Sequence, residues 1–148
     1  MNLRVGLDIG ATSLKLAALC SSNGHKEVPE RHVGEQFVRL AFPTGSPQAD
    51  KAFLVSRYRR IQGNPLQAAY DLLLELQQWA GANAVESIRV TGSGGRRVAN
   101  LLNCGYENEF RALAKGVRSM HPEVRTIFEM GGASSRYLRL DPADASRR

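Results

Sequence analysis

The chain has 148 residues, of which 43% are hydrophobic and 23% charged, as expected of an ordinary globular domain with a core of its own. Its net charge of +6 favours anionic ligands, but the arginines are scattered, so a nucleic-acid-binding arm is not indicated and a nucleic-acid partner is not expected. The sequence has no membrane-length apolar run, no signal-peptide core and no CxxC pair, which favours a reduced, cytoplasmic protein.

The first half of the chain predicts strands. Residues 3–9 (LRVGLDI) form a buried strand, and residues 14–20 return antiparallel to it after a glycine turn. Many glycine, proline and polar residues then predict an irregular insertion over 22–50, with a short strand near 35–42. A clearer strand follows at 52–60.

Helices and strands alternate in the second half. Residues 63–82 have the apolar spacing of a helix, with Pro65 in its first turn and Gly81 at its end. The remaining predicted elements are a strand at 86–92, helices at 95–105 and 107–121, a strand at 123–130 and a return strand at 136–141. This order predicts an α/β fold with a mixed sheet.

The turn in DIGATSLK is a candidate phosphate site. Asp8 stands near a strand end, where a carboxylate can hold Mg²⁺ directly or through water. Gly10 allows backbone N–H groups to face phosphate oxygens, and the following hydroxyls add donors. The candidate phosphate-binding residues are Gly10, Ala11, Thr12, Ser13 and Lys15. The alternative is an ordinary hairpin with glycine and serine in its turn.

A second turn, in EMGGASSR, has a similar pattern after a predicted strand. Glu129 precedes the glycines, and the candidate phosphate-binding residues are Gly131, Gly132 and Ala133. Two such turns facing each other would grip the β- and γ-phosphates of a nucleotide, which is most of what phosphoryl transfer requires. There is no P-loop, and GSGGRR at 92–97 lacks the dinucleotide spacing.

Four stretches together resemble a known family. They are VGLDIGATSLKLAAL, SRYRRIQGNP, VTGSGGRR and the long segment 107–140. In this order they are similar to the BadF/BadG/BcrA/BcrD ATPases, which activate 2-hydroxyacyl-CoA dehydratases and benzoyl-CoA reductase-type systems. The resemblance implies the actin, Hsp70 and sugar-kinase fold. Residues 1–122 would form an actin-like ATPase lobe with a ribonuclease-H-like sheet, and 123–148 the first hairpin of an incomplete second lobe.

The resemblance also implies a site, with departures. ATP and Mg²⁺ would be the ligands, Asp8 would hold the metal through water, and Asp8 and Glu129 would be the catalytic carboxylates. The family's second motif usually ends Gln-Asp-Ser-Lys, whereas this chain has Ala-Ser-Ser-Arg. The cysteine that binds a [4Fe–4S] cluster shared by a family dimer is here Ala112, so we expect no cluster. The resemblance implies a 2-hydroxyacyl-CoA dehydratase or benzoyl-CoA reductase-type partner, and it allows a dimer of this chain.

Three other functions fit the sequence less well. The altered second turn and the end at Arg148 fit a truncated or degenerate lobe that serves as an interaction module or survives as a remnant. The first turn alone would also suit a sugar-kinase-like phosphotransferase lobe. The charge of +6 and the ribonuclease-H-like order would also suit a nucleic-acid binder, but a nuclease would need a larger carboxylate cluster than Asp8 and Glu129 provide.

Overall fold

The computed structural model describes residues 2–20, 35–46, 52–132 and 134–141. Most of the expected insertion at 22–50, and the candidate Ala133, lie outside this part. The described elements are β1 (Leu3–Ile9), β2 (Ser13–Cys20), β3 (Phe37–Ala41), β4 (Ala52–Ser56), β5 (Arg59–Arg60), α1 (Pro65–Ala80), β6 (Val85–Thr91), α2 (Gly95–Leu101), β7 (Gly105–Tyr106), α3 (Glu109–Met120), β8 (Thr126–Met130) and β9 (Ser135–Arg139).

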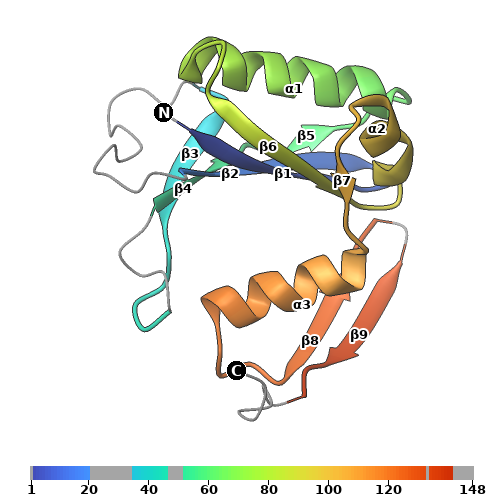
Figure 1. The fold of residues 1–148 in the computed structure, drawn as a ribbon. Coiled ribbons are helices and arrows are strands. Elements are labelled where there is room, and N and C mark those ends of the chain that lie inside the picture. Colours follow the sequence, from blue (N-terminus) through green and yellow to red (C-terminus); the bar gives the residue numbers. More distant parts are fainter. Residues whose placement is uncertain (1, 21–34, 47–51, 133, 142–148) are drawn as a thin grey trace.

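The main sheet has seven described strands and is mixed (Figure 1). Its strand order is β3-β4-β2-β1-β6-β7, and β5 also pairs with β2. β1 is antiparallel to β2, while β6 runs parallel to β1 and β7 parallel to β6. The prediction of an α/β fold with a mixed sheet is therefore confirmed. β8 and β9 form a separate antiparallel pair.

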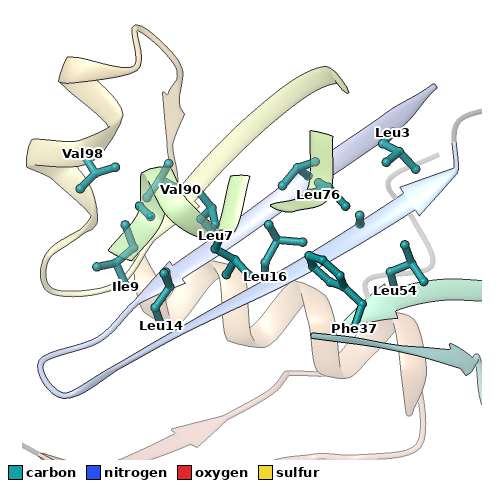
Figure 2. Packing of buried hydrophobic residues seen from close by; sticks show 14 of the residues in the cluster. Leu3, Leu7, Ile9, Leu14, Leu16, Phe37, Leu54, Leu76, Val90 and Val98 are labelled. Atoms are coloured by element: carbon teal, nitrogen blue, oxygen red, sulfur yellow. The ribbon is translucent and has the colours of Figure 1, made fainter. Parts of the chain in front are cut away.

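The core lies on one face of the main sheet, as the alternation along β1 requires. The buried side chains of β1 are Leu3, Val5, Leu7 and Ile9. They pack with Leu72 and Leu76 of α1 and Val98 of α2 in one cluster (Figure 2). The alternate residues, among them Asp8, lie on the other face. α3 and the β8–β9 pair lie on that side of the sheet (Figure 1).

The ends of the helices have recognisable causes. The side chain of Asn64 caps α1 by accepting a hydrogen bond from the Gln67 N–H at 3.1 Å, and Pro65 occupies the first turn. Gly81 ends the helix with φ 100°. Asn108 caps α3 by accepting from the N–H of Phe110 at 2.9 Å. The predicted positions of both helices are thus confirmed. No described helix is long and apolar enough to cross a membrane.

Two local predictions were wrong. The strand expected at 52–60 is two strands, because β4 pairs with residues 17–19 of β2 and β5 pairs with residues 13–14. At the end of β4, the buried hydroxyl of Ser56 accepts a hydrogen bond from the N–H of Leu16 at 2.9 Å. The helix expected at 95–105 ends at Leu101, and Gly105 belongs instead to β7, a two-residue strand that pairs with β6 and that no sequence pattern indicated.

Candidate functional site

The two glycine turns have the same hydrogen-bond pattern. In the first turn (residues 10–13) the N–H of Gly10 donates to the carbonyl of Ser13 at 3.0 Å. In the second turn (residues 131–134) the N–H of Gly131 donates to the carbonyl of Ser134 at 2.9 Å. A Cβ atom at Gly10 or Gly131 would stand 3.3 or 3.2 Å from that same carbonyl oxygen. Both turns therefore favour glycine at their first position.

The chain brings the two turns into contact. A Cβ atom at Gly132 would lie 2.8 Å from Oγ1 and 3.2 Å from Cγ2 of Thr12. The second turn therefore approaches the first so closely that a side chain at Gly132 would press against the side chain of Thr12. Two segments separated by about 120 residues of sequence therefore lie side by side in the fold.

A pocket of about 310 Å³ lies where the turns meet. Its lining includes all the candidate residues that the structure describes: Asp8, Gly10, Ala11, Thr12, Ser13, Lys15, Glu129, Gly131 and Gly132. Ala112 lines it too, on α3. The lining residues not proposed as site residues from the sequence are Thr91, Ser93, Glu109, Leu113, Ser134 and Arg136.

Asp8 lies between unlike neighbours. In the register of the main sheet it is opposite Lys15 on β2 and Thr91 on β6. Burial raises the pKa of the Asp8 carboxyl above its ordinary value, and the charges of Glu109 and Glu129 act in the same direction. Lys15 opposes this shift with its positive charge. The Asp8 carboxylate is therefore partly desolvated.

Arg136 connects the second turn to α3. Its guanidinium forms ion pairs with Glu109 and with Glu129, the latter at 3.3 Å. It also lies over the ring of Phe110, 5.2 Å from the ring centroid. The sequence contains one signal for this residue: Arg136 follows Glu129 at the same spacing at which Lys15 follows Asp8. In the structure each of these pairs is opposite across its hairpin.

A third turn, between β6 and α2, completes the wall beside β1. Gly92 has φ 98°, and a Cβ atom there would lie 2.2 Å from the carbonyl oxygen of Ile9. The N–H of Gly94 donates to the same oxygen at 2.9 Å. This turn brings Ser93 into the pocket. Thr91 also lines the pocket, and its buried Oγ1 has no hydrogen-bond partner among the residues that the structure describes.

Comparison with known proteins leaves the family open. No family model matches the chain, and no curated protein is significantly similar to it. The resemblance to the BadF/BadG/BcrA/BcrD ATPases therefore stays an expectation from the sequence. Within the described residues, no group of three or more His, Cys, Asp or Glu side chains is arranged to hold a metal ion.

Proposed function

We propose that this chain binds a nucleoside triphosphate, ATP, with Mg²⁺, between its two glycine turns. The observation that carries the proposal is their convergence: both turns share one hydrogen-bond pattern, touch at Thr12 and Gly132, and line one pocket. Each turn also follows a strand that carries a carboxylate opposite a cation. Polyphosphate needs backbone donors and positive charge together, and this pocket offers both.

The fold supports the same conclusion. The antiparallel β1–β2 pair, continued by parallel strands on the other side of β1, suits a ribonuclease-H-like sheet in an actin-like ATPase lobe. On this proposal residues 1–122 form that lobe, and 123–148 begin a second one. The protein would act as an activase-like ATPase in the cytoplasm, with an acyl-CoA dehydratase or reductase as partner.

Each pocket residue has a role suited to its chemistry. The hydroxyls of Thr12 and Ser13 and the turn amides would donate hydrogen bonds to phosphate oxygens, and Lys15 would neutralise their charge. Asp8 would hold Mg²⁺ through water, with Glu129 as a second oxygen donor. This donor set fits Mg²⁺, which prefers oxygen ligands and needs only one or two carboxylates beside phosphate and water. When bound, the ion would neutralise phosphate charge.

Hydrolysis has weaker support than binding. The carboxylate of the family's second motif is replaced by Ser134, and Glu129 is already paired with Arg136. A water-activating base must be free to accept a proton, so the ion pair works against Glu129 in that role. We propose no [4Fe–4S] cluster, because Ala112 stands where the family has its cysteine.

Calorimetric titration of the full chain with ATP and excess Mg²⁺ tests the proposal. We expect saturable binding that raises the melting temperature, and Asp8→Asn should weaken it. Glu123→Gln removes a charge from a side chain that is 71% exposed and outside the pocket lining, so it is the matched control. Absence of binding by the folded wild-type chain would reject the function.

One observation favours the second candidate function, an interaction module. The outer face of the β8–β9 pair exposes Phe128, Met130 and Tyr137, which are 71, 85 and 60% exposed. Such an apolar patch is typical of a surface covered by protein. If the chain is mainly such a module, sedimentation will show self-association that Phe128→Ser with Tyr137→Ser removes, and calorimetry will show no binding of ATP.

A further inference from the structure

Arg136 forms ion pairs with two carboxylates of the pocket. Its guanidinium is paired with Glu109 at the start of α3 and with Glu129 on β8, and Phe110 lies against it. The side chains of Arg136 and Glu109 are only 23 and 18% exposed. Water screens such an ion pair less than one on the surface, so the pair with Glu109 constrains Arg136.

A phosphate at the second turn would compete for the same cation. The guanidinium fork fits a carboxylate and a phosphate equally well in geometry, but the phosphate carries more charge. Of the two carboxylates that pair with Arg136, Glu109 is easier to release than Glu129. It lies in the first turn of α3, where the helix dipole favours a negative charge, so its carboxylate remains stabilised after Arg136 leaves.

We propose that Arg136 is a phosphate-responsive latch: Glu109 holds it in the ligand-free pocket, and the bound polyphosphate takes it over. This inference rests on the proposed function and adds a specificity device to it. The pair with Glu109 lowers the affinity of the pocket for anions, because an anion must displace a carboxylate before it can bind Arg136. Singly charged anions would fail this test, whereas a polyphosphate would pass it.

A double-mutant cycle tests the latch by calorimetry with Mg-ATP. Glu109→Gln should tighten binding about tenfold, since Arg136 is released without competition, and Arg136→Gln should weaken it about tenfold. The double variant should bind like Arg136→Gln alone, because without Arg136 there is nothing to release. Glu123→Gln makes the same change of charge away from the pocket and should leave the affinity unchanged.

The outcomes separate the latch from general electrostatics and from the function itself. If Glu109→Gln tightens binding as much in the Arg136→Gln background, the effect is mere loss of negative charge and the latch is wrong. If wild type binds Mg-ATP and Asp8→Asn weakens binding, while neither latch variant changes it, only the latch fails. If wild type does not bind, both proposals fail. Should circular dichroism find Arg136→Gln unfolded, Arg136→Lys replaces it, and the gain from Glu109→Gln must shrink there.

Discussion

Gly92→Ala tests the close approach that builds the wall beside β1. The added Cβ would lie 2.2 Å from the carbonyl oxygen and 2.5 Å from the carbonyl carbon of Ile9, both backbone atoms that cannot rotate away. An alanine at φ 98° costs about 1 kcal/mol in backbone strain. The backbone shift that would remove the clash costs about 2 kcal/mol more. For a chain of this length we expect a melting temperature lower by roughly 10 °C.

Gly81→Ala separates the two contributions. Gly81 has nearly the same φ, 100°, but no atom of the described part of the chain lies within 4 Å of the Cβ position there. This control should cost only backbone strain, which is about 2 kcal/mol because ψ is 154° and this region is almost restricted to glycine, or roughly 6 °C by differential scanning calorimetry. If Gly92→Ala destabilises the protein no more than Gly81→Ala does, the β6–α2 turn does not press against Ile9, and the described wall of the pocket is wrong.

Two further predictions concern ionised groups. Burial raises the pKa of Asp8 above 3.8 in the folded protein. Ionisation of Asp8 therefore lowers the free energy of unfolding as the pH rises from 3.8 through the folded-state pKa, and this loss remains at neutral pH. Asp8→Asn should therefore raise the urea midpoint of the ligand-free protein at pH 7 but not in acid, where the difference disappears; equal midpoints at pH 7 would contradict this. The pKa of Glu107 is lowered, chiefly by its hydrogen bond from Lys115 at 2.8 Å, so its contribution is present above 4.5 and is lost as pH falls through the folded-state pKa. Glu107→Gln should lower the urea midpoint at pH 7 in dilute buffer but hardly at all at about 1 M salt, and a loss independent of salt would refute an electrostatic role.

The fold was predictable wherever local chemistry determines it. The alternation along β1 determines its bounds and its buried face, and Asn64, Pro65 and Gly81 mark the ends of α1. Pairing between distant strands was not predictable. The break between β4 and β5 depends on which residues of β2 each one meets, and β7 exists only because Gly105 pairs with Arg89 on β6. No local pattern contains these partners.

The pocket was predictable in its parts but not in its assembly. The glycines, hydroxyls and carboxylates of both turns are visible in the sequence, yet the contact of Gly132 with Thr12 depends on how the β8–β9 pair docks. The same docking brings Arg136 to Glu109, 27 positions earlier in the chain. Periodicity predicts that α3 is a helix but not its angle to a hairpin that follows it.

The two hairpins carry equivalent acid–base pairs, and Arg136 is the base of the second pair. Asp8 and Lys15, like Glu129 and Arg136, are opposite each other across a hairpin, so each turn has one acid and one base at equivalent places. The second pair differs because a third group, Glu109 on α3, also binds the base. An arginine can serve two carboxylates through its fork, whereas a lysine offers a single charged atom. A second acidic partner therefore favours arginine over lysine at position 136.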